Sequence, residues 1–128
     1  MNSKEATDFV ESWARAWNAH DLEDVLSHFS DDVVFTSPLA RQLLVGSDGV
    51  IRGKDALRAY WREGLRQIPD LHFEVLGVYL GVGTLVINYK NQKGGLVSEV
   101  LVFDHNMVKE GHGTYLSAGA KPTGATPD

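Results

Sequence analysis

The sequence predicts an α+β fold in which three N-terminal helices pack on a strongly curved, mostly antiparallel sheet. Apolar residues recur at helical spacing over the first part of the chain and alternate at strand spacing over most of the second part. Segregation of helices from strands is typical of α+β proteins. Within residues 71–80 the alternation changes parity, from Leu71, Phe73 and Val75 to Leu76, Val78 and Leu80. Such a change indicates a β-bulge, which bends a sheet.

Three helices are expected. The first runs from Ser3, an available N-cap, through Trp17, with its apolar residues on one face. Asp21 can cap a short second helix, whose apolar face is formed by Leu22, Val25, Leu26 and Phe29. Gly53 precedes the third helix, which Pro69 ends because proline cannot continue the hydrogen-bond ladder.

The remaining segments read as strands joined by turns. A strand that begins at Asp31 stops abruptly at Ser37 and Pro38, and further strands are expected at 71–80, 84–89, 96–103 and 107–116. A bent sheet with helices on its concave side encloses a cone with an apolar interior and one open mouth, which is a common form of ligand pocket. We expect one domain over residues 1–117 and a disordered tail over residues 118–128.

Composition excludes several classes of protein. The chain has no cysteine, so disulfides and thiolate chemistry are absent, and a cytoplasmic location is expected. A net charge of −5 with scattered basic residues argues against a nucleic-acid partner. No apolar run reaches the ~18 residues of a membrane span, so no membrane partner is expected. The five histidines show no metal-ligand spacing, and there is no glycine-rich phosphate loop. We therefore predict neither metal nor cofactor.

Several motifs resemble the nuclear transport factor 2-like superfamily, in particular its SnoaL-like and ketosteroid-isomerase-like branches. They are WNAHDL at 17–22, FSDDVVF at 29–35, Ser37-Pro38, GKDAL at 53–57 and EVLVFD at 99–104, and the resemblance covers about residues 5–117. It implies a cone-shaped fold. Function follows less directly, because this superfamily includes isomerases, cyclases, dehydratases, hydrolases and members without known catalysis.

The resemblance also implies that ketosteroid isomerisation is lost. By the family pattern, the proton-shuttling carboxylate corresponds to Ser37, the tyrosine donor to Trp13 and the protonated aspartate to Leu101. A hydroxyl without an adjacent base cannot take a proton from carbon. The segment between Pro38 and Gly53 is longer than the isomerase connection. It is either a lid near the pocket mouth or a surface connector that packs Leu43 and Leu44 on the helices.

Glu99 is the candidate acid–base residue. It lies in an apolar strand, and alternation places it on the same face as Leu101 and Phe103. If it faces the pocket, desolvation should raise its pKa. The alternative is an ion pair with a neighbouring Arg or Lys. The other predicted pocket residues are aromatic or apolar, except Ser37: Trp13, Trp17, Ser37, Tyr60, Trp61, Leu101, Phe103 and Tyr115. Core packing is the competing interpretation for the helix aromatics.

Three functions remain open from the sequence. The first is a cofactor-free isomerase, cyclase or dehydratase that uses Glu99 on a small, largely apolar carbonyl or hydroxyl compound. The second is a non-catalytic module that binds an apolar or amphipathic molecule, and the third is a dimerisation scaffold with a vestigial pocket. Val100 and Val102 give the outer face of the sheet an apolar surface, so a homodimer through the sheet is expected.

Overall fold

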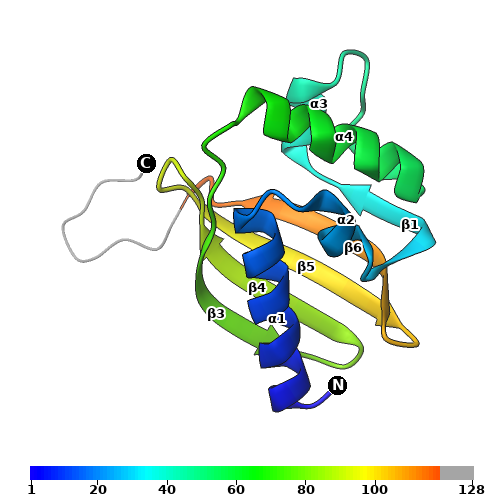
Figure 1. Cartoon of the computed structure of the whole chain (residues 1–128), viewed down its shortest axis with the longest axis vertical. Coiled ribbons are helices and arrows are strands. Elements are labelled where there is room, and N and C mark those ends of the chain that lie inside the picture. The colour runs from blue at the N-terminus through cyan, green and yellow to red at the C-terminus, as the bar shows by residue number, and fades with distance from the viewer. Residues whose placement is uncertain (119–128) are drawn as a thin grey trace.

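The computed structural model describes residues 1–118, in which helices α1–α4 accompany a six-stranded sheet (Figure 1). The elements in chain order are α1 (Ser3–Asn18), α2 (Leu22–Leu26), β1 (Phe29–Thr36), α3 (Pro38–Leu43), β2 (Val50–Arg52), α4 (Lys54–Gln67), β3 (Glu74–Leu80), β4 (Thr84–Lys90), β5 (Leu96–Asp104) and β6 (Met107–Tyr115). Apart from Ala118, the predicted tail lies outside the described residues.

The sheet has the strand order β2-β1-β6-β5-β4-β3. Neighbouring strands are antiparallel except β1 and β6, which run parallel and bring the first and last strands together. The predicted α+β class and the curved, mostly antiparallel sheet are confirmed. The sheet remains open at β2 and β3, its two edge strands.

The parity change predicted a bulge at the correct place. The pairing of β3 with β4 shifts register between Val75 and Gly77. The strand itself begins at Glu74, three residues later than the alternation suggested. Residues 71–73 are held instead by side chains at the end of α1. The Asn18 amide both donates to the carbonyl oxygen of Phe73 and accepts from its N–H, at 3.0 and 2.8 Å.

Two local predictions were wrong, and one segment contains elements that were not predicted. The N-cap of α1 is Asn2 rather than Ser3, because Asn2 and Glu5 form a reciprocal capping box. Phe29 lies at the start of β1, since α2 ends at Leu26. The segment between Pro38 and Gly53, expected to be a lid or a surface connector, contains α3 and the edge strand β2. Its Leu43 and Leu44 pack against the core.

The helices divide the concave face of the sheet into two regions. In Figure 1, α1 crosses β3, β4 and β5, whereas α4 lies over β1 at the other side. Side chains from α1 and the strands fill the space beneath α1, where Trp13 and Leu101 are fully buried. No helix within residues 1–118 is long and apolar enough to span a membrane.

Candidate functional site

A cavity with an open mouth lies beside α4 at the end of the concave face, and the space in it that water can reach is about 50 Å³. All the elements except α2, β2 and β3 contribute to its wall, together with the segment between α4 and β3. The lining residues are Trp17, Phe35, Ser37, Leu39, Tyr60, Trp61, Gly64, Leu65, Ile68, Leu71, Phe73, Tyr89, Glu99, Gly113 and Tyr115. Seven of these fifteen residues are aromatic, and Glu99 is the one charged side chain among them.

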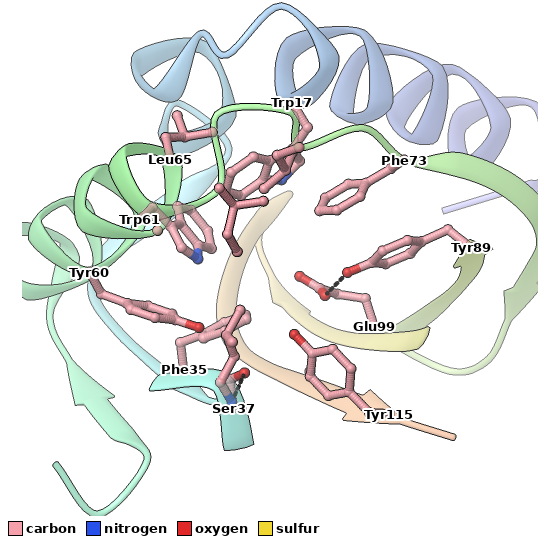
Figure 2. Close-up of a pocket in the computed structure, with 15 residues that line it drawn as sticks. Trp17, Phe35, Ser37, Tyr60, Trp61, Leu65, Phe73, Tyr89, Glu99 and Tyr115 are labelled. Atoms are coloured by element: carbon pink, nitrogen blue, oxygen red, sulfur yellow. Dashed lines mark hydrogen bonds between the residues drawn. The ribbon is translucent and has the colours of Figure 1, made fainter. Parts of the chain in front are cut away.

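Glu99 reaches this cavity from the middle of β5. The buried positions of β5 alternate, and Glu99 takes its place between Val97 and Leu101 on the concave face. Its side chain is directed into the cavity (Figure 2). It is 5 % exposed, and it is one of two polar residues buried to this degree in the described chain, Ser37 being the other.

The carboxyl group of Glu99 has a single hydrogen-bond partner among residues 1–118. The hydroxyl of Tyr89, on the adjacent strand β4, donates to its Oε1 at 3.2 Å. Ile87 pairs with Glu99, and Tyr89 lies two residues farther along β4, opposite Val97. None of the ion pairs in the described chain involves Glu99. Its Oε2 is thus available to a bound molecule.

Burial raises the pKa of Glu99 from 4.5 to about 7. Desolvation is the larger cause, because it disfavours the charged form, and the hydrogen bond from Tyr89 opposes it only in part. Near neutral pH both the carboxylic acid and the carboxylate are therefore populated. A group in this state can both accept and return a proton.

Three tyrosines surround this carboxyl group. Burial raises the pKa of Tyr60, Tyr89 and Tyr115, and proximity to Glu99 acts in the same direction on each. The phenols therefore stay protonated near neutral pH. Figure 2 shows the hydroxyls of Tyr60 and Tyr115 directed into the space that Glu99 faces. Near neutral pH these hydroxyls can donate hydrogen bonds but cannot act as bases.

Ser37 ends β1 and also begins α3. Its hydroxyl oxygen accepts a hydrogen bond from the N–H of Leu39 at 3.1 Å, which makes Ser37 the N-cap of α3. No histidine, lysine or arginine lines the cavity, and no hydrogen bond within residues 1–118 joins the Ser37 hydroxyl to Glu99. Ser37 thus positions a wall of the cavity and has no means of acting as a nucleophile.

The structure brings six of the predicted site residues to the cavity: Trp17, Ser37, Tyr60, Trp61, Glu99 and Tyr115. The other three lie elsewhere. Trp13 is fully buried behind the wall, where its ring contacts Phe73 and Tyr89 with centroids 5.6 and 5.3 Å away. Leu101 is sealed in the core. Phe103 packs edge-on against Phe9 of α1 at 5.3 Å.

Sequence reasoning missed several lining residues. Tyr89 shared the alternation of β4 with Leu85 and Ile87, and pairing β4 with β5 would have placed it beside Glu99. Phe73 belonged to a predicted strand, but it lies in the segment before β3. Leu39 was not predicted, because no sequence pattern identified α3 as part of the cavity wall.

The glycines of β6 make different contributions. Gly111 and Gly113 lie on the same face of β6 as Tyr115. At Gly111, a Cβ atom would lie 2.8 Å from Phe35, so that ring already fills the space. At Gly113, a Cβ atom would lie 3.4 Å from the Ser37 oxygen, and the residue lines the cavity. Of these two glycines, only Gly113 leaves space at the cavity.

No group of three or more His, Cys, Asp or Glu side chains among residues 1–118 is placed to hold a metal ion. The site therefore offers one carboxyl group, three phenols and indole N–H groups in an apolar wall. Such a set can move a proton and bind oxygen atoms of a ligand.

Comparison with known proteins places this chain in a family. Residues 10–112 match the model of the SnoaL-like domain. A SnoaL-like protein of unknown function from Burkholderia thailandensis is 41% identical, with a TM-score of 0.84 over 91% of this chain and 99% of that one. Among curated proteins, none is significantly similar to this chain.

More distant structures share the fold alone. A candidate polyketide cyclase from Sinorhizobium meliloti is 12% identical, with a TM-score of 0.71 over 89% of this chain and 100% of that one. TerC, crystallised with polyporic acid, is 10% identical, with a TM-score of 0.73 over 88% and 92% of the two chains. The family match, the 41% identical relative and the shared fold agree with the architecture described above. The chain belongs to the SnoaL-like domain family.

Proposed function

We propose that this protein is a cofactor-free proton-transfer enzyme in which Glu99 acts as acid and base on a small, largely apolar carbonyl or hydroxyl compound. The observation that carries the proposal is the environment of Glu99. Its carboxyl group is buried in an open-mouthed aromatic cavity without a basic partner among the described residues, which holds its pKa near neutrality. Structural carboxylates are usually paired with a cation when they are buried this deeply.

The chemical step follows from the groups present. The Glu99 carboxylate removes a proton from the carbon beside a carbonyl group, and the C–H electron pair moves to the carbonyl oxygen. An enolate forms, and Glu99 becomes the carboxylic acid. Return of the proton to another atom of the same molecule completes an isomerisation without any second reactant. The Tyr89 hydroxyl, 3.2 Å from Oε1, orients the carboxyl group throughout.

The Glu99 carboxylic acid can also lose its proton to water, and this returns the enzyme to its active carboxylate form. With a pKa of about 7, the carboxylate re-forms at neutral pH. General acid–base catalysis of this kind contributes roughly 10²–10⁴-fold to a rate. The buried, mainly apolar wall also excludes water from an enolate, which limits side reactions.

Hydrogen–deuterium exchange at carbon tests the proposal directly. 1-Indanone, a neutral aromatic ketone, is dissolved in D₂O with the protein, and loss of its C2 proton signal is followed by NMR. We expect the wild-type protein to accelerate exchange and the Glu99→Gln variant to lose at least about 100-fold of that acceleration, as expected for removal of an acid–base group. Tyr115→Phe is the matched control, because it keeps Glu99 and changes only a neighbouring donor.

Two results would contradict the proposal. The first is exchange at the same rate in wild type and Glu99→Gln. The second is saturable binding of 1-indanone by the wild-type protein without any acceleration of exchange. That second result supports the other candidate function, a non-catalytic ligand-binding module.

We also propose a homodimer formed through the convex face of the sheet. Val86, Val100 and Val102 are directed to that face, away from the concave face that holds Leu85, Ile87 and Leu101, and Tyr79 is 63% exposed there. None of the four helices in the described chain covers this surface (Figure 1). Light scattering should give about twice the chain mass of 14.1 kDa. Val100→Lys should return it to the monomer mass, and a wild-type monomer at micromolar concentration would contradict the proposal.

A further inference from the structure

The indole N–H of Trp61 is a hydrogen-bond donor without a partner at the cavity. Trp61 lies on α4, is 6 % exposed and lines the cavity. Figure 2 shows its nitrogen directed toward the space that Glu99 also faces. No hydrogen bond within residues 1–118 uses this N–H. This nitrogen is not among the polar atoms sealed from solvent, so water or a ligand in the cavity can accept its hydrogen bond.

The ring of Trp61 is held in a fixed orientation. Three aromatic rings meet it edge to face, with Trp17, Phe29 and Phe35 at centroid distances of 4.9, 5.3 and 5.4 Å. These contacts come from α1 and β1, so two separate elements fix the ring. The N–H therefore points into the cavity without needing to reorganise when a ligand arrives, which is the property of an effective donor site.

The other two indoles provide a comparison. The nitrogens of Trp13 and Trp17 are also without a partner, but both are sealed from solvent. Trp13 does not line the cavity at all. A ligand in the cavity can satisfy the N–H of Trp61 as the structure stands, whereas the N–H of Trp13 stays inaccessible.

The rest of the wall limits the chemistry of that ligand. No Lys, Arg or His lines the cavity, and Glu99 would repel an anion when ionised. Seven of the lining residues are aromatic, which favours a flat ring: Trp17, Phe35, Tyr60, Trp61, Phe73, Tyr89 and Tyr115. The ligand should therefore be neutral and planar, and it should carry an oxygen acceptor.

From this geometry we infer that Trp61 binds the carbonyl oxygen of a neutral, planar cyclic ketone and holds the adjacent C–H toward Glu99. The inference rests on the proposed function, and it narrows the substrate to ketones rather than alcohols. The Trp61 N–H is then the donor that stabilises negative charge on the oxygen as Glu99 removes the proton. An alcohol oxygen could accept the same hydrogen bond, but an alcohol has no carbonyl group to take up the electron pair when the adjacent C–H loses its proton.

Indole N–H signals in a ¹⁵N correlation spectrum test the inference. The chain has three tryptophans, so three signals are expected, and Trp→Phe variants assign them. On titration with 1-indanone, the Trp61 signal should move downfield. Indane has a similar ring but no oxygen, and it should leave that signal nearly unchanged. Trp13 serves as the internal control, and its signal should respond to neither compound.

Binding to the variants provides a second measurement. Trp61→Phe keeps an aromatic ring but removes the donor, so the preference for 1-indanone over indane should fall about tenfold, the scale of one hydrogen bond. Trp13→Phe should keep the preference. The inference would be overturned if the Trp61 signal did not move with saturating 1-indanone, or if it moved equally with indane. An unchanged preference in Trp61→Phe would overturn it as well.

The Glu99→Gln variant separates this inference from the proposed function. It cannot take a proton from carbon, yet it retains the Trp61 donor. If the Trp61 signal still moves downfield with 1-indanone in this variant, the binding role stands whatever the exchange experiment shows. If exchange is fast in wild type but Trp61→Phe binds and reacts normally, the ketone is held by another donor and the inference is wrong.

Discussion

The concave face of the sheet has a packed end and an open end, and β5 passes through both. At the packed end, Leu101 is fully buried and Phe103 meets Phe9 of α1 edge to face. At the open end, two residues earlier, Glu99 faces a cavity. The alternation of side chains along β5 places Glu99, Leu101 and Phe103 on the same face of the sheet. What differs is the helix above them, because α1 crosses the sheet at one end only (Figure 1).

This difference separates two kinds of role for inward-facing residues. Side chains under α1 contribute to stability because they fill space completely. Side chains beyond α1 keep part of their surface open, as the 39% exposure of Tyr115 shows. Residues at the packed end should therefore control unfolding, and residues at the open end should control ligand binding and proton transfer.

The largest effect is expected at the packed end. Leu101→Ala removes a fully buried side chain and leaves a cavity, which should lower the free energy of unfolding by about 3 kcal/mol. Tyr115→Phe at the open end should change it by less than about 0.5 kcal/mol. Urea unfolding of both variants measures the contrast. Equal losses would show that the two ends are not energetically distinct.

The next effect concerns the pH dependence of stability. Because the pKa of Glu99 rises from 4.5 in the unfolded chain to about 7 in the folded one, ionisation opposes folding. This contribution to stability is present below pH 4.5 and is lost as pH rises through 7. Glu99→Gln cannot ionise. Its stability relative to wild type should therefore increase between pH 4 and pH 8, by up to about 3 kcal/mol.

Unfolding measured at both pH values provides the comparison. Taking the difference between the two pH values removes any constant cost of replacing the carboxyl group by an amide. An ion-paired Glu99 would give the opposite sign, with the variant losing stability relative to wild type as pH rises.

A smaller effect is expected from the two glycines of β6. Gly111→Ala places a Cβ atom 2.8 Å from Phe35 and should cost about 1–3 kcal/mol through overpacking. Gly113→Ala meets the Ser37 oxygen at 3.4 Å, so its cost in stability should be below about 1 kcal/mol, while it narrows the cavity. Thermal unfolding together with 1-indanone titration of each variant separates packing from binding. A Gly113→Ala variant with the larger loss of stability would reverse the comparison.

Much of the fold could be predicted from residue periodicity. The helix stripes, the strand alternation and the parity change at Val75 each depend on local sequence, and the structure has the bulge at that position. The elements between Pro38 and Gly53 could not be predicted in this way. Both α3 and β2 are short, and β2 exists because its three residues pair with β1. Short elements of this kind depend on tertiary contacts rather than on propensity.

The candidate site was predictable to the level of a strand face. Alternation placed Glu99, Leu101 and Phe103 together, but it carries no information on depth along the cone. Depth depends on where α1 crosses, and this is a property of packing rather than of any one segment. For the same reason Trp13, matched to a pocket position by family resemblance, lies behind the wall and supports Phe73 and Tyr89.

The central claim is that Glu99 is a buried acid–base group that titrates near neutral pH, and a ¹³C NMR titration of its side-chain carboxyl carbon tests this most directly. The signal is assigned by its absence from Glu99→Gln, and its chemical shift is followed from pH 3 to pH 9. We predict a midpoint near the pKa of about 7 that burial imposes. A midpoint at or below the ordinary glutamate value of 4.5 would contradict the account, because Glu99 would then be a stabilised carboxylate rather than a proton-transfer group.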